Sequence, residues 1–526
     1  MGGDAMNAFP WLTGLTLVPV TGALFVLSFG GSNKNVARWL ALTFSFLALA
    51  LTLLLWAHFD SASCALQFQQ QVPWIAALGV EYHVGIDGLG LLMLLLTSIV
   101  VPIGILASSQ IQERAGLYFS LMLLLQACLF GTFTALNFFH WFIFWELSLI
   151  PAFFLIKLWG GSRSTAAATQ FLVYTMVGSI ALLLSFLAIF LATGKFDFIE
   201  LAALAQHGQL MPAVVAKLGW HRFTPHHVAL ILFAGAFLGF AVKVPLVPFH
   251  TWLPSAYTEA PTGTTIVLTG AMSKMGIYGF LRILLPIFGA EMQVVQVVLT
   301  PLLWLAVATI VLSAYAALAQ KDLKRIFAYS SINHLGYCLL AIFAVVKFTG
   351  GDAALTAEKY AAMNGVMLQI FNHALTAATL FWFVAMLEKR SGGLRGLNDF
   401  GGLRKVVPVF TGLMGIALFS SLGLPGLNGF VGEFLIFKGS FPLVSWATSL
   451  SVLGLLATAI FILGILQRVF SGPLNEKWAT LPDLTTVERL SLAPAIGLMF
   501  VLGLYPQLIL GFVNSTVMQM VQQLKF

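Results

Sequence analysis

Residues 137–161 read NFFHWFIFWELSLIPAFFLIKLWGG, a stretch in which the acid Glu146 stands inside an otherwise apolar run. Hydrophobic residues make up 59% of the 526 positions and charged residues only 9%, and the mean hydropathy is +0.95. Soluble domains carry about 25% charged residues. The composition therefore predicts a protein embedded in lipid, and the fold has to explain a carboxylate at membrane depth.

Apolar segments of helix length follow one another from end to end of the chain. About 20 residues cross the roughly 30 Å of hydrocarbon in a bilayer, and continuous runs exclude an outer-membrane barrel, whose shorter strands alternate. We therefore expect an all-α polytopic membrane protein with 14 transmembrane helices, over 9–29, 37–57, 86–108, 116–136, 138–157, 170–192, 228–249, 262–288, 295–319, 326–347, 361–387, 406–438, 447–470 and 488–512.

The distribution of basic residues predicts the orientation. Loops after odd-numbered segments carry about twice as many Lys and Arg residues as loops after even-numbered segments. Because basic loops remain in the cytoplasm, both termini are predicted on the non-cytoplasmic side. The tail has an apolar helical face and is predicted to be an interfacial helix; that face consists of Val513, Val517, Met520, Val521 and Leu524.

Two segments are interrupted by proline and glycine. In the seventh, Pro245 and Pro248 follow Lys243, and in the twelfth, Pro425 and Gly426 precede Glu433. A proline inside a helix costs about 3 kcal/mol, and loosened backbone at membrane depth needs protein or internal water to satisfy it. Segments 4–8 and segments 9–13 form two blocks of five, and the interrupted segment is the fourth in each block. Because five is an odd number, the two blocks enter the membrane in opposite orientations, as inverted repeats. Paired breaks in inverted halves indicate an ion path.

These blocks suggest a division of the chain into four parts: 1–110 with helices 1–3, 116–288 and 295–470 with one five-helix repeat each, and 488–526 with the last helix and the tail.

Several ionisable residues fall inside the predicted spans. Each charge at the bilayer centre costs about 2.5–3.5 kcal/mol, and a Glu–Lys pair about 4 Å apart recovers roughly 4 kcal/mol at an effective dielectric constant near 20. Any one of these residues could be a structural clamp or a packed, hydrogen-bonded side chain. So many in one chain favour ion conduction. They are Glu146, Lys243, Lys274 and Glu433, with the histidines His250, His334 and His373.

Other classes of function lack support in the sequence. The net charge of +7 comes without a basic cluster interleaved with aromatic residues, so nucleic acid is not an expected partner. Cys64, Cys128 and Cys338 are scattered and form no CxxC or Cys/His motif. Neither a GxGxxG turn after a strand nor a P-loop is present. No cofactor or metal is therefore expected in this chain.

At the ionisable residues the sequence resembles a known family. The stretches FWELSLIP (144–151), FAVKVPLVPFHTWLPSAYTEAPT (240–262), SKMGIYGFLRILLP (273–286), YSSINHLGY (329–337), FNHALTAATLFW (371–382) and GLPGLNGFVGEF (423–434) are similar to the antiporter-like membrane subunits of respiratory complex I, NADH:quinone oxidoreductase. The likeness covers about residues 80–470. It implies fourteen helices and proton transfer across a membrane arm.

The resemblance also implies a role for each residue. Glu146 and Lys243 match a salt-bridged pair, and Lys274 matches the central lysine. His334 and His373 match polar residues that link the centre to the exit, and His250 follows the motif of helix 7. Glu433 matches the exit position, where sister subunits tend to have lysine. Separation of Glu146 from Lys243 would then drive a proton from Lys243 to Lys274 and on toward Glu433.

The same resemblance implies the surroundings of the chain. Flavin, iron–sulfur clusters and quinone are expected in other subunits, and the partners are the other membrane-arm subunits, including sister antiporter-like subunits, the lipid bilayer and protons. The location implied is the inner membrane of a bacterial cell. Two alternatives stay open: a homologous subunit of a sodium/proton antiporter or membrane-bound hydrogenase, and a structural membrane scaffold.

Overall fold

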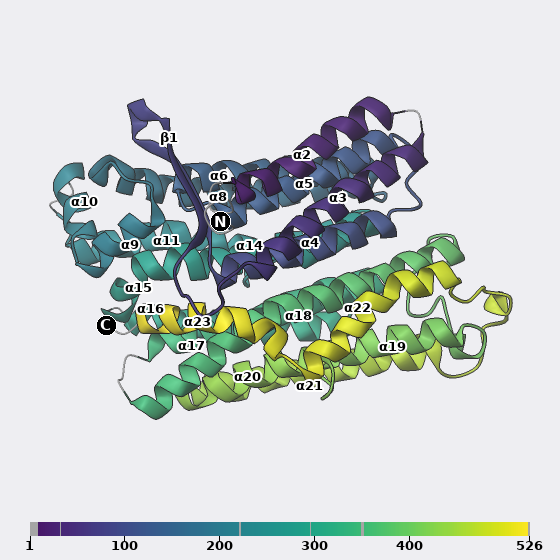
Figure 1. Ribbon diagram of the computed structural model, residues 1–526. Coiled ribbons are helices and arrows are strands. Elements are labelled where there is room, and N and C mark those ends of the chain that lie inside the picture. Colours follow the sequence, from purple (N-terminus) through teal and green to yellow (C-terminus); the bar gives the residue numbers. More distant parts are fainter. Residues whose placement is uncertain (1–8, 32, 220–221, 295, 349–351, 524–526) are drawn as a thin grey trace.

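The computed structural model describes residues 9–31, 33–219, 222–294, 296–348 and 352–523. Within these residues, thirteen helices are long and apolar enough to cross a membrane. They lie side by side in one elongated bundle (Figure 1). The predicted all-α membrane fold is confirmed, whereas the predicted count of 14 spans is not, because the predicted twelfth span, 406–438, is divided into the shorter helices Pro408–Leu422 and Asn428–Leu443.

The first part of the bundle follows the predicted spans closely up to the seventh. The helices α4 and α5 are almost wholly buried, whereas α2 and α3 expose large apolar side chains, as expected for helices that face lipid. The predicted span 138–157 consists of two helices joined at Ser148. The elements are α2 (Trp11–Phe29), α3 (Lys34–Ala57), α4 (Gly88–Ala107), α5 (Ala115–Thr134), α6 (Phe138–Leu147), α7 (Leu149–Trp159), α8 (Ser164–Thr193), α9 (Phe198–Gln206), α10 (Leu210–Leu218) and α11 (Pro225–Lys243).

The middle of the chain contains an irregular span. Between Thr262 and Gly289 the chain forms one helical span in which two π-helical turns flank the short helix that begins at Lys274. Such wide turns are rare and frequently occur at functional sites. The elements are α12 (Trp252–Glu259), α13 (Thr262–Val267), η2 (Leu268–Met272), α14 (Lys274–Gly279), η3 (Phe280–Leu284), α15 (Leu285–Val294), α16 (Gln296–Leu318) and α17 (Leu323–Lys347).

The last part contains the longest helix, α18, with 39 residues. It passes through the middle of the bundle, and nearly all of its side chains between Ala362 and Leu387 are buried. The remaining elements are α18 (Ala353–Ser391), α19 (Pro408–Leu422), α20 (Asn428–Leu443), α21 (Ser445–Ile465), the π turn η5 (Leu466–Phe470), α22 (Thr486–Leu504) and α23 (Gln507–Gln523).

Both predicted interruptions are present. Helix α11 ends at Lys243 and the chain becomes helical again only at Trp252. Helix α19 ends at Leu422, and α20 begins at Asn428. Between these two helices Gly423 (φ 79°) and Gly426 (φ 93°) take left-handed backbone conformations that other residues adopt only with strain.

Small residues bring α18 and α20 into backbone contact. A methyl group added at Gly365 of α18 would lie 2.6 Å from the backbone nitrogen of Ile436, and one at Gly439 of α20 would lie 2.5 Å from that of Ala362. Side chains at these positions would force the helices apart. The twelfth span therefore packs directly on α18, which carries His373.

Between the predicted spans 37–57 and 86–108 the chain forms a β-hairpin, which hydropathy did not predict. Strands β1 (Gln67–Ile75) and β2 (Val80–Ile86) pair antiparallel and extend from one end of the bundle (Figure 1). In β2, Nδ1 of the buried His83 lies 2.5 Å from Asp197 Oδ2 in the segment that leads into α9. This contact ties the hairpin to the loop after α8.

The predicted tail helix is present as α23, but it begins at Gln507, because the predicted last span 488–512 ends at Leu504, and one face of the helix is buried in the protein. Val513, Val517 and Val521 lie on that face, and the helix contacts α4 and α18. The side chain of Thr516 accepts a hydrogen bond from the backbone nitrogen of Gly88 at 2.9 Å. The helix therefore packs on protein along this face. Leu524 lies outside the described residues.

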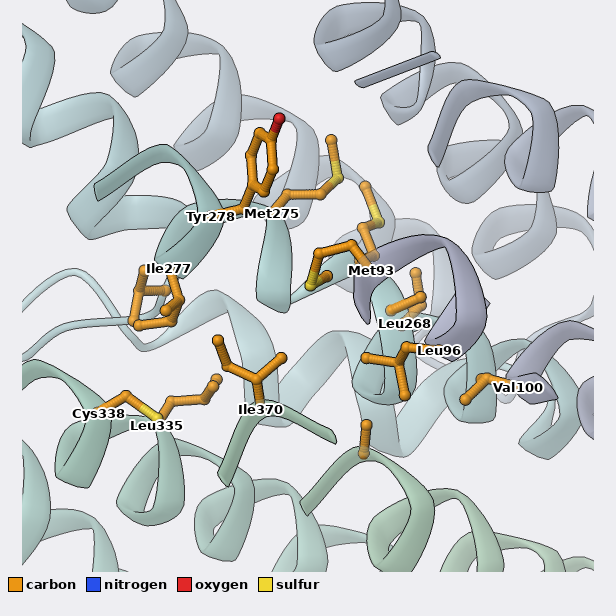
Figure 2. Packing of buried hydrophobic residues seen from close by; sticks show 14 of the residues in the cluster. Met93, Leu96, Val100, Leu268, Met275, Ile277, Tyr278, Leu335, Cys338 and Ile370 are labelled. Carbon is orange, nitrogen blue, oxygen red and sulfur yellow. The ribbon is translucent and has the colours of Figure 1, made fainter. Parts of the chain in front are cut away.

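Apolar packing fills the centre of the bundle. Figure 2 shows Met93 of α4, Met275 of α14, Leu335 of α17 and Ile370 of α18 among the side chains that project into this region. All four are completely or almost completely inaccessible to solvent. Polar groups at the same depth must therefore find their partners within the protein.

Candidate functional site: a row of buried ionisable side chains

Lys274 lies at the centre of the site and is completely buried. The preceding π turn, η2, positions it at the start of α14. Its amine donates to the carbonyl oxygen of Thr269 and lies 3.3 Å from Ser273 Oγ and 2.9 Å from His373 Nδ1. The predicted central lysine is thus in direct hydrogen-bond contact with a predicted relay histidine on another helix.

The two histidines face each other from adjacent helices. His373 of α18 and His334 of α17 are 7% and 3% exposed, and their ring centroids are 5.1 Å apart. Side chains from α17, α18, α19 and α20 line a cavity of about 20 Å³ beside them, which is room for about one water molecule. Its polar lining residues include Ser331, Gln369 and Ser421. The two rings therefore line the same water-sized space.

Glu433 of α20 completes the row. Its Oε1 lies 3.0 Å from His334 Nδ1, and the residue is 6% exposed. The interruption between α19 and α20 gives the carboxylate its space, because a methyl group added at Gly423 would lie 2.8 Å from Glu433 Oε2. The break in the twelfth span therefore positions the acid that the sequence predicted at this site.

His334 has two competing partners on the same nitrogen. Besides Glu433, the amide nitrogen of Gln369 lies 3.3 Å from His334 Nδ1. A protonated imidazole forms an ion pair with the carboxylate, whereas an unprotonated Nδ1 accepts from the amide. Both protonation states of the imidazole thus have a hydrogen-bond partner, which is what a relay group needs. Sequence reasoning missed Gln369, although it lies one helical turn before His373.

Asparagine side chains hold the helices of this row together. Asn372 Nδ2 donates to the backbone oxygen of Asn428 at 2.7 Å, and Asn428 Nδ2 donates to that of Asn372 at 3.2 Å. The carboxamide oxygen of Asn428 also accepts from Ser420 Oγ at 2.5 Å. These hydrogen bonds connect α18 with α20 and, through Ser420, with α19, on the two sides of the interruption in the twelfth span.

The other half of the site differs from the prediction. Lys243 is 2% exposed at the end of α11, and Glu146 lies in α6. Within the described residues, Lys243 Nζ and Glu146 Oε1 are both buried and have no hydrogen-bond partner. The expected direct Glu146–Lys243 salt bridge is therefore not formed in this structure. The amine instead lies 4.9 Å from the ring centroid of Trp145, a cation–π contact.

His250 is also not part of this row. It lies in the interrupted segment between α11 and α12, and among the described residues its buried Nδ1 has no hydrogen-bond partner. The structure therefore joins Lys274, His373, His334 and Glu433, and it leaves Glu146, Lys243 and His250 as a separate group without direct hydrogen bonds to them.

A second cluster of charges, which the sequence did not reveal, lies where α12, α17 and α18 end or begin. Lys324 is 1% exposed and donates to the backbone oxygen of Ala260 at 2.6 Å, although it reads as a loop residue in the sequence. Arg395 contacts Asp322 at 2.5 Å and Glu388 at 3.1 Å. Burial opposes the charge of Arg395, but the nearby Asp322 and Glu388 carboxylates outweigh it and raise the pKa of the guanidinium.

Another buried ion pair lies near the far end of the irregular span Thr262–Gly289, whose start adjoins the charge cluster. Arg282, in the π turn η3, pairs with Asp87 at the start of α4. Asp87 also caps α4 by accepting from the backbone nitrogen of Gly90 at 3.0 Å. The two residues are 195 positions apart, so nothing in either local sequence indicates the pair.

The model of the family described as NADH:quinone oxidoreductase/Mrp antiporter, TM, matches residues 135–460. The chain belongs to this family. It is 34% identical over 516 residues to NADH-quinone oxidoreductase subunit M of Rhodobacter capsulatus, which covers 97% of this chain and 96% of the relative. It is 36% identical over 503 residues to F(420)H(2) dehydrogenase subunit M of Methanosarcina mazei, with 94% and 95% covered.

A solved structure agrees with these relatives. A chain of respiratory complex I from Thermus thermophilus with bound NADH superposes on this chain with a TM-score of 0.80 and 26% identity, over 98% of this chain and 99% of that one. The predicted resemblance to antiporter-like subunits of complex I is therefore confirmed, and the chain is an antiporter-like membrane subunit of the M type.

Proposed function

We propose that this chain translocates protons across a bacterial inner membrane as part of a respiratory quinone reductase. The observation that carries the proposal is the buried row Lys274–His373–His334–Glu433, in which direct contacts of 2.9 and 3.0 Å flank one small cavity. Ionisable groups inside a membrane bundle are costly and are kept where they conduct ions.

The row supports stepwise transfer. A protonated Lys274 donates to His373 Nδ1, and the proton crosses the cavity to His334 and then reaches the Glu433 carboxylate. Each group is held by a different helix, α14, α18, α17 or α20. A small displacement of any one helix therefore changes the electrostatic attraction between neighbouring groups, which is the means by which a distant reaction would drive the proton.

We propose that Glu146 and Lys243 load this row. Among the described residues, Lys243 Nζ and Glu146 Oε1 are buried without a hydrogen-bond partner, and the ring of Trp145 contacts the lysine. An approach of Glu146 would hold a proton on Lys243, and its withdrawal would release that proton toward Lys274. His250, in the adjoining break, is proposed as a side group of this path.

The relatives favour a quinone reductase over a stand-alone sodium/proton antiporter, a hydrogenase or a structural scaffold. Identities of 34% and 36% over almost the whole chain are to M subunits of two oxidoreductases, whose names state different electron donors. We propose that the donor site, flavin, iron–sulfur clusters and quinone all belong to other subunits, and that sister antiporter-like subunits are direct neighbours in the membrane.

Replacement of Lys274 by methionine tests the proposal. The purified complex, reconstituted in vesicles, is assayed for quinone reduction and for acidification of the lumen. Lys274→Met should lower the number of protons moved per electron pair, whereas Lys321→Met, at an exposed lysine near the start of α17, should leave it unchanged. An unchanged ratio in Lys274→Met would overturn the proposal. If the unsubstituted complex takes up sodium and Lys274→Met loses that uptake, the transported ion is sodium and not the proton.

The proposed orientation has its own test, because Cys64 is exposed and lies beside the β-hairpin, while Cys128 and Cys338 are buried. In intact cells with a permeabilised outer membrane, a membrane-impermeant maleimide should label Cys64, identified by mass spectrometry of its peptide. Labelling only after the inner membrane is opened would place the hairpin and both termini in the cytoplasm.

A further inference from the structure

A groove of about 390 Å³ opens at the end of the bundle opposite the β-hairpin. Four membrane helices have an end there: α3 begins at Lys34, α4 ends at Ala107, α18 ends at Ser391 and α22 begins at Thr486. Because membrane helices end where the hydrocarbon ends, the groove lies at the depth of the lipid head groups.

The walls of the groove combine apolar side chains with tryptophan. Trp39 is 68% exposed and Val487 is 73% exposed, and both border a deeper surface formed by Leu42, Trp382 and Met386. Tryptophan is enriched at the membrane–water boundary, where its ring is partly apolar and partly polar. An acyl chain would therefore find an apolar surface that continues from the groove toward the hydrocarbon.

Two cations in the groove form no ion pair with any residue that the structure describes. Arg38 donates to the backbone oxygen of Leu106 at 3.0 Å, but its Nε is buried and, among the described residues, has no hydrogen-bond partner. Lys389 is exposed and makes no ion pair within the described part of the chain. Both side chains line the same groove. The buried, unpartnered Nε indicates that Arg38 is arranged for an acceptor from outside the protein.

One carboxylate also lines the groove, and its charge is already balanced. Glu488 Oε2 accepts from Arg390 Nη2 at 2.5 Å and from the backbone nitrogen and hydroxyl of Thr485 at 2.9 and 3.0 Å. The surface charge that remains is positive. The loops at this end are also the more basic ones, which predicts the cytoplasmic leaflet with its anionic lipids.

We propose that this groove binds one anionic phospholipid of the adjoining leaflet, with its phosphate between Arg38 and Lys389 and an acyl chain along Trp39 and Val487. Guanidinium and ammonium groups recognise phosphate by charge-assisted hydrogen bonds. A zwitterionic lipid carries its own cation next to the phosphate, so the two side chains attract it less strongly. The bound lipid would connect α3 and α4 with α18 and α22, which are far apart in sequence.

Photo-crosslinking in the intact complex tests the site. The complex is reconstituted in vesicles with phosphatidylglycerol or phosphatidylcholine that carries the same photoreactive acyl chain, and peptic peptides that cover residues 36–43 and 380–390 are analysed by mass spectrometry. Phosphatidylglycerol should label these peptides more strongly than phosphatidylcholine. Lys389→Gln should reduce the labelling about fivefold, from the contribution of one basic residue near a membrane surface, and Arg38→Gln in addition should reduce it further.

Lys405→Gln serves as the control, because Lys405 is exposed in the same basic loop region and does not line the groove. It should leave the labelling unchanged. Lys389 is exposed, so its replacement does not endanger folding, whereas Arg38 also anchors the end of α4. Equal labelling by both lipids, unchanged labelling in Lys389→Gln, or absence of labelling because a neighbouring subunit covers the groove would each overturn the proposal.

Discussion

Shortening Glu433 by one carbon separates the effect of distance from the effect of charge. In Glu433→Asp the carboxylate retreats by about 1.5 Å, the length of one C–C bond, so its distance of 3.0 Å from His334 Nδ1 grows to about 4.5 Å. At an effective dielectric constant near 20, the attraction between the carboxylate and a protonated imidazole falls from about 5.5 to about 3.7 kcal/mol. A loss of about 1.8 kcal/mol corresponds to a factor of about 20 in the rate of a step that depends on this attraction.

Proton pumping driven by quinone reduction measures this effect. We expect Glu433→Asp to lower the rate of lumen acidification by about an order of magnitude, with a much smaller change in the assembly of the complex, because the net charge of the site is kept. The control is Glu358→Asp, which lengthens the Lys438–Glu358 pair from its present 2.6 Å. That lysine side chain is 47% exposed, and such surface pairs contribute roughly 0–1 kcal/mol.

Two outcomes would refute the reasoning. Wild-type pumping in Glu433→Asp would show that the distance between the carboxylate and the imidazole does not control transfer. An equal loss of pumping in Glu358→Asp would show that shortened acids impair this protein irrespective of their place in the row.

Three further changes test other parts of the structure. His373→Leu removes the 2.9 Å contact to the central lysine and should abolish pumping in vesicles while the complex still assembles; retained pumping would remove His373 from the path. Gly429→Ala places a methyl group 1.9 Å from a backbone oxygen of α19 and should reduce assembly on native gels, whereas Gly415→Ala, which meets nothing within 4 Å, should not. Asp197→Asn weakens the 2.5 Å contact to His83. Because hydrogen bonds to charged groups contribute about 1.5–3 kcal/mol, this change should lower the melting temperature in detergent and expose the hairpin to protease. An unchanged melting temperature would show that this contact does not hold the hairpin.

Hydropathy and proline placement predict the features that depend on local sequence. Long apolar runs predict spans because each backbone polar group in lipid must be satisfied within its own helix. The same logic predicts the interruptions after Lys243 and before Glu433, where proline and glycine prevent a regular helix. The resemblance then indicated which buried residues to compare, and the structure brings four of the seven into one row.

Features that depend on contacts between distant segments could not be predicted from the sequence. The π turns on either side of Lys274 arise from a change in hydrogen-bond register that leaves no compositional mark. Lys324 reads as part of a basic loop, and only the packing of α12 against α17 shows that it is buried. The Glu146–Lys243 pair was expected from resemblance, but the indole of Trp145 contacts the lysine instead.

The close glycine packing between α18 and α20 constrains how the site can move. Because their backbones touch at Gly365 and Gly439, neither helix can slide past the other without a steric clash. The scaffold of His373 and Glu433 therefore behaves as a rigid unit. We therefore expect any change in the geometry of the row to come from the helices on either side of this unit, α17 with His334 or the π-flanked α14 with Lys274.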